Sequence, residues 1–318
     1  MAVTVLVSGG GGAAAIGAIK SLRMGGFDGR IIAADAEPLS AGLYLADGFR
    51  VLPRAKDPTF YPSLKRLIEE EAIGILFPTS GFDIYEFARH KPELEALGTV
   101  VAMSDLDAMS VCENKWEFYL KTQGAFPLPE TSRDPASWNR FPCFVKPTFG
   151  KGSRDTHRCL TREELEFHTG PTRDMLIQEY LPGEEYTVDV LSDLAGAPLL
   201  AVPRVRLETK EGISSKGRVL RDPEIERLCL DLARHLALKG PTCMQLKRDE
   251  HDRPKFLEVN PRLGGGSIFA TLAGVNIPML LLDVIAGTRI APPPPKEIVV
   301  LRYYEEVVLD SSCVPNRP

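Results

Sequence analysis

The stretch LEVNPRLGGGS, residues 257–267, places an acid, an amide and an arginine ahead of a run of glycines. Apolar and polar side chains alternate at its start, and this period of two is typical of a β-strand that presents Glu258 and Asn260 on one face. Two oxygen donors on one face suit a hard cation such as Mg²⁺. Arg262 then supplies a fixed positive fork for a transferring phosphoryl group, and the glycines leave room for backbone donors.

The segment in front of this stretch predicts that it forms the second strand of a hairpin. CMQLKRD (243–249) and KFLEVN (255–260) are strand-like and flank the polar turn EHDRP, which is a hairpin signal. Gln245 on the first strand is therefore expected to face the same cavity as Glu258, and it becomes a third candidate metal ligand.

A second motif, KPTFGKGSR at residues 146–154, follows a strand-like run and sets two glycines among cations. It lacks the GxxxxGK[ST] order of a Walker loop. We expect instead a hairpin flap whose backbone N–H groups close over phosphates, with a solvated basic turn as the alternative. The residues of this motif that we assign to phosphate binding are Lys146, Gly150, Gly152, Ser153 and Arg154.

A third motif, QEYLPGEEYTVD at residues 178–189, contains two strand-like segments joined by Pro182-Gly183. Such a joint exposes backbone donors and acceptors to an adenine, and a carboxylate follows at a distance suited to ribose hydroxyls. Acids around a Pro-Gly turn also commonly face water alone, so taken singly this motif leaves both interpretations open.

The first 105 or so residues show the rhythm of a doubly wound α/β domain. VTVLV (3–7), the turn Gly9–Gly12, a small-residue helical pattern and RIIAAD (30–35) form a strand, turn, helix, strand unit. Two further strand-like runs follow, so we predict a parallel sheet. The capping box Ser110-x-x-Glu113 predicts the start of the next helix.

The glycine turn at residues 9–12 is compatible with two functions. With Asp35 at the end of the next strand, it could form a dinucleotide fingerprint in which the glycines approach a pyrophosphate and the acid holds a ribose. That interpretation makes the protein an NAD(P)-binding oxidoreductase. The alternative is a tight structural turn that touches a substrate.

Taken in chain order, these motifs resemble the ATP-grasp superfamily, and particularly its carbamoyl-phosphate-synthase-like carboxylate–amine ligases. The resemblance implies an α/β plus α+β architecture: a Rossmann-like parallel-sheet domain followed by a bilobal ATP-grasp fold. It divides the chain into residues 1–108 for the preceding domain, 109–182 for the small lobe with its phosphate flap, and 183–318 for the large lobe with the metal site and a C-terminal strand.

The resemblance also assigns roles around the phosphates. Glu258 would bridge two Mg²⁺ ions, for which Mn²⁺ can substitute, and Asn260 would bind one of them. Gln245 stands where many members have an acid, which would make one ligand neutral. Arg262 would stabilise the transition state that forms the acyl phosphate, and two basic residues, Lys115 and Lys146, would contact the phosphates of ATP.

Further roles follow for the nucleotide and for the acceptor. The adenine hinge would be Glu179, Tyr180 and Leu181, and the ribose-binding acid would be Glu185. In the segment RVRLETKEGISSKGRV (204–219), Lys216 and Arg218 are the candidates for catalytic residues near the γ-phosphate and the acceptor substrate.

The reaction implied by the resemblance starts when a carboxylate, which we expect to be amino-acid-like, attacks the γ-phosphate of MgATP. An amine then displaces phosphate from the acyl phosphate, so that ADP and phosphate are released. The partners are thus small-molecule carboxylates and amines. Besides the oxidoreductase interpretation, a nucleotide-binding protein without turnover remains an alternative.

Composition excludes several other classes of protein. The 318 residues contain 38 Lys plus Arg against 43 Asp plus Glu, so no basic excess points to nucleic acid as a partner. The six cysteines have no CxxC spacing, and the chain has no apolar run long enough for a signal peptide or a membrane span. We expect a cytoplasmic enzyme with no membrane partner, and homodimerisation only by default.

Overall fold

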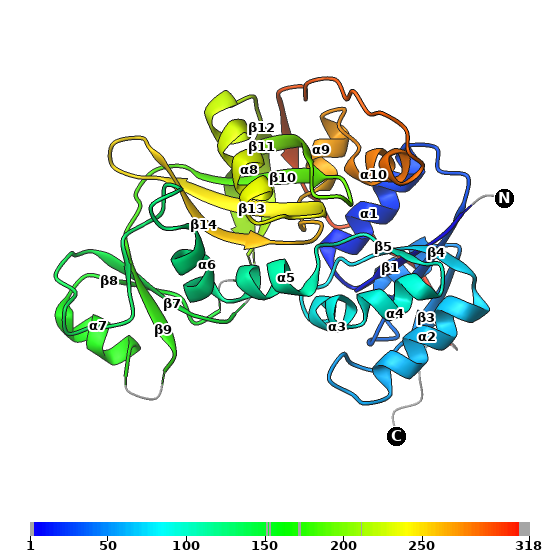
Figure 1. The fold of residues 1–318 in the computed structure, drawn as a ribbon, viewed down its shortest axis with the longest axis horizontal. Helices are drawn as coiled ribbons and strands as arrows, with labels where there is room; N and C mark the ends of the chain where they lie inside the picture. The colour runs from blue at the N-terminus through cyan, green and yellow to red at the C-terminus, as the bar shows by residue number, and fades with distance from the viewer. Residues whose placement is uncertain (1–2, 151, 153, 171–172, 211, 312–318) are drawn as a thin grey trace.

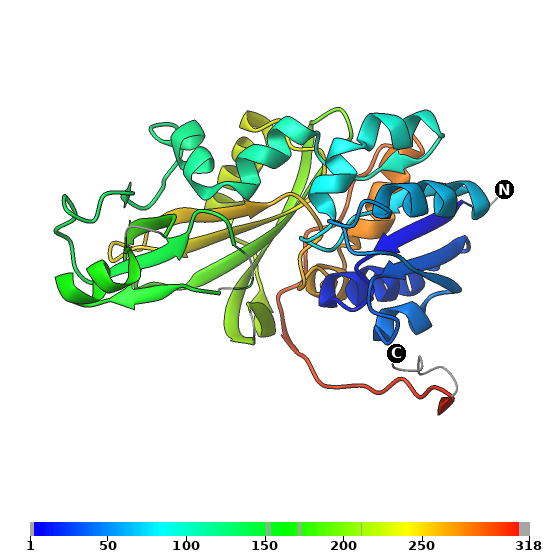
Figure 2. The same cartoon turned by 90° about the horizontal axis from the view of Figure 1, so that it is seen from below.

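The computed structural model describes residues 3–150, 152, 154–170, 173–210 and 212–311. Three sheets follow one another along the chain. Figure 1 and Figure 2 show the N-terminal sheet and its helices at one end of an elongated molecule, the four-stranded sheet at the other end, and the six-stranded sheet between them. None of the described helices is long and apolar enough to cross a lipid bilayer.

The N-terminal sheet is parallel, with the strand order β3-β2-β1-β4-β5. Its central strand is buried on both faces at Val5, Leu6 and Val7, as expected for a continuous apolar run in a parallel sheet. The predicted parallel-sheet domain is confirmed. Its elements are β1 (Thr4–Ser8), α1 (Ala13–Met24), β2 (Arg30–Asp35), the 3₁₀ helix η1 (Ala41–Leu45), β3 (Gly48–Val51), α2 (Phe60–Glu70), β4 (Ile73–Phe77), α3 (Ile84–Arg89), α4 (Lys91–Ala96) and β5 (Val100–Val101).

Two short helices, α5 (Leu106–Glu113) and α6 (Lys115–Thr122), lead out of this domain. The predicted capping box is wrong, because Ser110 lies inside α5 and its hydroxyl donates to the carbonyl of Leu106. The side chain of Asn114 caps α6 instead, accepting hydrogen bonds from the N–H groups of Trp116 at 3.0 Å and Glu117 at 3.1 Å. This cap puts Lys115 at the first position of α6.

The small sheet is antiparallel, with the order β6-β9-β7-β8. Its core is formed by Trp138, Val145, Leu165 and Ile177, packed with both cysteines of the Cys143–Cys159 cross-strand pair. The elements are β6 (Thr131–Ser132), β7 (Cys143–Pro147), β8 (His157–Cys159), α7 (Arg162–His168) and β9 (Met175–Glu179).

The large sheet is antiparallel, with the order β14-β13-β10-β11-β12-β15. Helix α8 covers one face with Ile225, Cys229 and Leu232. The predicted hairpin is confirmed, and Gln245 lies directly opposite Glu258 in its register. The elements are β10 (Glu185–Ser192), β11 (Pro198–Lys210), β12 (Ile213–Val219), α8 (Pro223–His235), β13 (Gly240–Arg248), β14 (Pro254–Asn260), α9 (Ile268–Leu272), α10 (Ile277–Ile285) and β15 (Ile298–Leu301).

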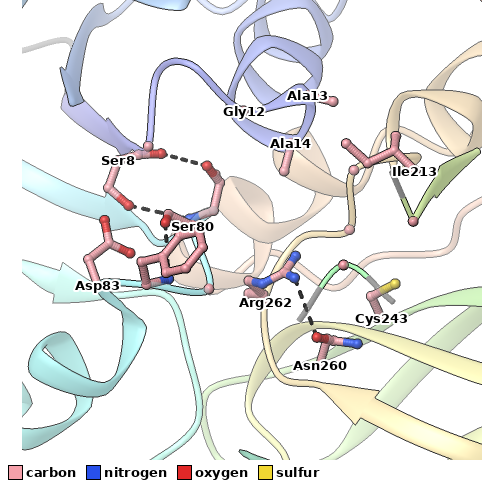
Figure 3. A pocket seen from close by; sticks show the side chains of 18 of the residues that line it. Ser8, Gly12, Ala13, Ala14, Ser80, Asp83, Ile213, Cys243, Asn260 and Arg262 are labelled. Atoms are coloured by element: carbon pink, nitrogen blue, oxygen red, sulfur yellow. Dashed lines mark hydrogen bonds between the residues drawn. The ribbon is translucent and has the colours of Figure 1, made fainter. Parts of the chain in front are cut away.

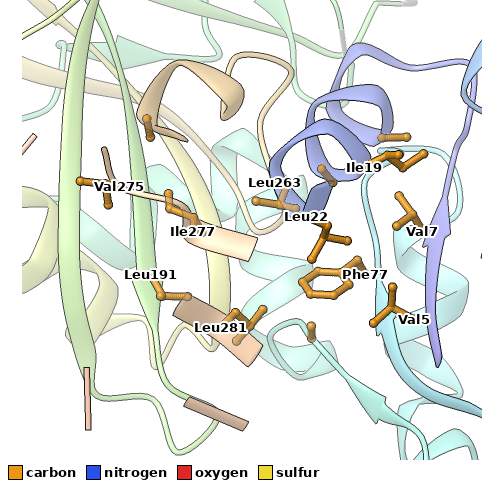
Figure 4. Close-up of a cluster of buried hydrophobic side chains, with 14 of the residues drawn as sticks. Val5, Val7, Ile19, Leu22, Phe77, Leu191, Leu263, Val275, Ile277 and Leu281 are labelled. Atoms are coloured by element: carbon orange, nitrogen blue, oxygen red, sulfur yellow. The ribbon is translucent and has the colours of Figure 1, made fainter. Parts of the chain in front are cut away.

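The N-terminal domain and the large sheet share one hydrophobic core. Helices α9 and α10 pack against α1, so that Ile19 and Leu22 lie in the same buried cluster as Ile277 and Leu281 (Figure 4). A hydrogen bond of 2.7 Å from the side-chain amide of Asn276 to the carbonyl of Ser21 ties the same helices together. The N-terminal domain and the large sheet are therefore held together by direct packing, and not by a linker alone.

Candidate active site

Two adjoining cavities lie along the large sheet. The larger, of about 870 Å³, lies between this sheet and the N-terminal domain, and the smaller, of about 190 Å³, lies between it and the small sheet. Seven of the described residues line both cavities, which therefore meet at a junction. These residues are Gly150, Gly152, Arg154, Arg206, Gly212, Gln245 and Glu258.

The candidate metal ligands meet at this junction. The side-chain amide of Asn260 donates to Oε1 of Glu258 at 3.0 Å, and Gln245 is the cross-strand neighbour of Glu258. One carboxylate and two amide oxygens are hard donors that fit Mg²⁺. The described residues contain no group of three His, Cys, Asp or Glu side chains that could hold a metal ion, so the fit to a cation rests on this mixed set.

Arg262 follows the metal ligands and reaches into the larger cavity. Its guanidinium donates to the carbonyl of Leu263 at 2.9 Å and to Oδ1 of Asn260 at 3.3 Å. Figure 3 shows Arg262 and Asn260 on one side of this cavity, facing Ser8 and Ser80 on the other. The guanidinium is thus held by the loop that also positions a candidate metal ligand.

Two lysines border the smaller cavity next to Glu258. Lys146 is buried, and its ammonium donates to the carbonyl of Leu257 at 3.0 Å. Burial lowers the pKa of Lys146 to about 8, with Glu258 opposing this shift and Lys115 adding to it. The ammonium of Lys115 donates to the carbonyl of Gly150 at 3.0 Å and lies 3.9 Å from a carboxylate oxygen of Glu258.

The glycine-rich motif after β7 lies at the junction of the cavities. Its described residues Gly150, Gly152 and Arg154 line both of them. The expected role of Ser153 falls on a position that lies outside the described residues. Placement of a cation and two glycines at the junction agrees with the geometry that a phosphate-covering loop needs.

The predicted adenine and ribose residues, Glu179, Tyr180, Leu181 and Glu185, all line the smaller cavity. The carboxylate of Glu179 is buried and ion-paired with Arg140 and Lys255. Its charge is therefore satisfied within the protein, and the backbone of this segment is what remains for a base. The guanidinium carbon of Arg158 lies over the ring of Tyr180, 4.3 Å from the ring centroid.

Lys216 and Arg218 are not brought to the junction, which corrects the expectation for them. Neither is among the described residues that line the two cavities. Their side chains are about half exposed and pair with acids, Lys216 with Glu208 at 2.8 Å and Arg218 with Glu184 at 3.6 Å. On strand β12 the alternation of the pleat turns both side chains toward solvent.

Two arginines on the neighbouring strand β11 were missed by the sequence reasoning. Arg204 and Arg206 are buried and line the larger cavity, and Arg206 also lines the smaller one. Arg204 pairs with the buried carboxylate of Asp189. The signal was available, because two arginines at i and i+2 in a strand share one face.

The glycine turn at residues 9–12 uses three of its amides within the protein. The N–H of Gly10 bonds to Ala34 at 3.0 Å, that of Gly11 to the carboxylate of Asp35 at 2.7 Å, and that of Gly12 to Gly9 at 2.9 Å. Three successive amides and the acid are thus satisfied within the protein. This arrangement matches the alternative of a structural turn, and Gly9 and Gly12 line the larger cavity.

The far end of the larger cavity lies in the crevice at the carboxyl ends of the parallel strands, where open α/β sheets bind ligands. Its polar wall includes Ser8, Ser80 and Asp83 (Figure 3). Apolar side chains from α2 and α3, among them Phe60 and Phe87, also line it. A mixed lining of this kind is typical of small-molecule sites.

Two protein families match separate parts of the chain. Residues 5–102 match the family described as PylC-like, N-terminal domain, and residues 171–307 match the family described as ATP-grasp in the biosynthetic pathway with Ter operon. The second match contains the strand pair with Gln245, Glu258 and Asn260. Residues 171–307 are thus an ATP-grasp domain, and it follows a PylC-like N-terminal domain.

Solved structures that contain an ATP-grasp domain have the same fold as this chain. An ADP complex of N5-carboxyaminoimidazole ribonucleotide synthetase has a TM-score of 0.74 at 14% identity, covering 94% of this chain and 81% of that one. Biotin carboxylase from Campylobacter jejuni has a TM-score of 0.70 at 17% identity, covering 91% and 72%. At these identities the likeness shows the fold.

One curated relative matches a short segment. A D-alanine–D-alanine ligase from Fervidobacterium nodosum is 38% identical over 76 residues, which covers 22% of this chain and 23% of that ligase. The match thus spans about a quarter of the relative's length.

Proposed function

We propose that this protein is an ATP- and Mg²⁺-dependent carboxylate–amine ligase. The observation that supports it most is the junction itself: Gln245, Glu258 and Arg206 border both the cavity next to the adenine hinge and the cavity under the N-terminal domain. A nucleotide in the smaller cavity would present its terminal phosphate at the junction, directly beside an acceptor in the larger one.

In this proposal the smaller cavity binds ATP. Lys115 and Lys146 face its phosphates, the backbone of Glu179 to Leu181 contacts the adenine, and Glu185 accepts hydrogen bonds from the ribose. Mg²⁺ on Gln245, Glu258 and Asn260 would neutralise charge on the phosphates. We propose two Mg²⁺ ions, the number that the family resemblance implies.

The larger cavity would hold the acceptor carboxylate. An oxygen of the carboxylate attacks the γ-phosphorus, the bond to ADP breaks, and Arg262 offsets the negative charge on the transferring group. An amine nitrogen then attacks the acyl carbon, phosphate leaves, and the nitrogen loses a proton. An amino-acid-like acid would fit a wall that carries both cations and acids, here Arg204 and Asp83.

The division of the chain at residues 108 and 182 is proposed on the same basis. Each of the three sheets lies within one of the resulting segments. The small-molecule partners, the cytoplasmic location and a homodimer remain part of this proposal.

The test is a screen for acid-dependent turnover. Wild-type protein with MgATP and hydroxylamine is incubated with a panel of amino acids and other carboxylates, and both ADP and hydroxamate are measured. We expect one acid class to stimulate both products, and Glu258→Gln to lose this stimulation by at least about a hundredfold. Exposed Glu250→Gln is the matched control. ATP binding without stimulation by any acid would favour a nucleotide-binding protein without turnover.

A further inference from the structure

Arg206 connects groups that belong to different parts of the proposed site. Its guanidinium donates to Oε1 of Glu185 at 2.5 Å, to Oε1 of Gln245 at 3.3 Å and to the carbonyl of Gly212 at 2.7 Å. The side chain is 6% exposed, and its Nε has no hydrogen-bond partner. The single guanidinium of Arg206 therefore binds both Glu185, an acid of the smaller cavity, and Gln245, a candidate metal ligand.

Glu185 is the acid of the smaller cavity that is best placed for ribose hydroxyls. Three described acids line this cavity. The carboxylate of Glu179 is taken by Arg140 and Lys255, and Glu258 belongs with Asn260 and Lys115 at the junction. Glu185 is left, and its side chain is 32% exposed, but one of its oxygens is already bonded to Arg206.

A vicinal diol and a guanidinium both donate to a carboxylate, so they compete wherever they use the same oxygen. A ribose that uses both oxygens of Glu185 competes with Arg206 for the oxygen that the guanidinium binds. The displaced guanidinium already lines both cavities, next to Gln245, and nucleotide phosphates would enter at that point. An arginine is well suited to bind phosphate in two-pronged fashion.

We propose that Arg206 is a positioning residue that occupies Glu185 while the site is free of nucleotide and transfers to the nucleotide phosphates when the ribose takes Glu185. This inference rests on the proposed nucleotide site and extends it. Adenosine then breaks the ion pair between Arg206 and Glu185 and offers the guanidinium no new partner. A nucleotide with phosphates breaks the same ion pair, but its phosphates bind the released guanidinium. Selection for triphosphate over nucleoside would thus be increased by a residue to which the sequence motifs assign no role.

The experiment measures dissociation constants for adenosine, AMP, ADP and β,γ-methylene-ATP by calorimetry, in EDTA and in Mg²⁺, on full-length wild type and Arg206→Met. We expect Arg206→Met to bind adenosine about three- to tenfold more tightly and β,γ-methylene-ATP about tenfold more weakly. Arg206→Lys, which keeps a charge, should regain most of the affinity for the triphosphate. Glu185→Gln should weaken adenosine binding.

Arg248→Met is the matched control, because Arg248 is also mostly buried and ion-paired, with Asp222 at 2.7 Å, on the same sheet but outside both cavities. Its ratio of triphosphate to adenosine affinity should equal that of the wild type. An equal loss for every nucleotide in Arg206→Met, or an unchanged ratio, would overturn the proposal. If Arg206→Met does not fold, Arg206→Gln, which also removes the charge, takes its place: opposite shifts for adenosine and the triphosphate support the proposal, and an unchanged ratio overturns it.

The proposal and the ligase function can fail separately. Nucleotide binding with the predicted opposite shifts, but without acid-stimulated ADP release, would refute the ligase and leave the role of Arg206 intact. Acid-stimulated turnover with parallel shifts in all affinities would do the reverse.

Discussion

The carboxylate of Asp35 closes the glycine turn that follows the first strand, since its Oδ2 accepts a hydrogen bond of 2.7 Å from the backbone N–H of Gly11. Its other oxygen accepts from the N–H of Glu37 at 2.9 Å. An acid bound in this way positions the wall of the larger cavity instead of holding a ribose. The same bond explains why a dinucleotide interpretation of this turn is not favoured.

Replacing Asp35 by alanine should therefore reduce stability. Two backbone N–H groups lose a charged acceptor, which corresponds to about 1–3 kcal/mol of the free energy of unfolding. Urea denaturation measures this, with exposed Asp28→Ala as the control. Titration of the wild type with NADH should give no binding at millimolar concentration. An unchanged free energy of unfolding in Asp35→Ala, together with tight binding of NADH by the wild type, would contradict the structural role.

Gly9 should be far more sensitive to alanine than another glycine of similar backbone conformation. Gly9 has φ +68°, and a Cβ there would lie 2.6 Å from the Cβ of Ser80; Gly26 has φ +72° with no atom within 4 Å of such a Cβ. We expect Gly26→Ala to cost about 1–2 kcal/mol for the left-handed conformation, and Gly9→Ala roughly 3–5 kcal/mol. Equal unfolding free energies for the two variants would remove the packing argument.

Nucleotide affinity should depend on pH through Lys146, whose pKa is lowered to about 8. Phosphates favour the charged ammonium, so the affinity for β,γ-methylene-ATP should fall above pH 8, by at most about tenfold per pH unit. Lys146→Arg keeps its charge and should give a flat profile between pH 8 and 9.5. A wild-type profile that is equally flat would rule out this titration.

The same pKa has a consequence for stability. The folded-state pKa of Lys146 lies below the unfolded value of 10.5, so the unfolded chain binds more protons between these pH values. The contribution of this group to the free energy of unfolding therefore rises from pH 8 to 10.5. Lys146→Arg lacks this rise, and comparing the two proteins isolates it.

Gln245→Glu should lower the Mg²⁺ concentration needed for nucleotide binding. The variant adds a second carboxylate opposite Glu258 in the hairpin register, and hard cations bind more tightly as ligand charge increases. We expect half-saturation at about tenfold less Mg²⁺ in a calorimetric titration of β,γ-methylene-ATP. Exposed Gln123→Glu carries the same added charge away from the site. A higher Mg²⁺ requirement would mean that the new acid pairs with Arg206 instead.

Some parts of the site could be predicted from the chain alone, because they depend on local periodicity. The alternation in residues 257–260 and the polar turn before it predict that Gln245 faces Glu258, and the register agrees. Other predictions were wrong where two nearby residues could both fill the same structural role. Ser110 and Asn114 both suit a helix start, and the side chain of Asn114 takes the cap.

The assignment of the basic residues in residues 204–219 shows the same limit. Arg204, Arg206, Lys216 and Arg218 all lie on neighbouring strands, and sequence spacing does not say which face of each strand meets a cavity. Only the pairing of β11 with β10 brings Arg206 beside Glu185. Lys216 and Arg218 on β12 point to solvent, where Lys216 pairs with Glu208.

By itself the sequence determined the parallel-sheet domain, the hairpin and the order of the motifs, since these follow from periodicity and turn chemistry over a few residues. The tertiary structure alone decided that two cavities meet and that Arg206 stands between them. The larger cavity exists because α9 and α10 pack on α1 across some 250 residues of chain, as in the Ser21–Thr271 contact, whose separation is 250. Contacts over such distances are set by the burial of whole faces, and no local pattern encodes them.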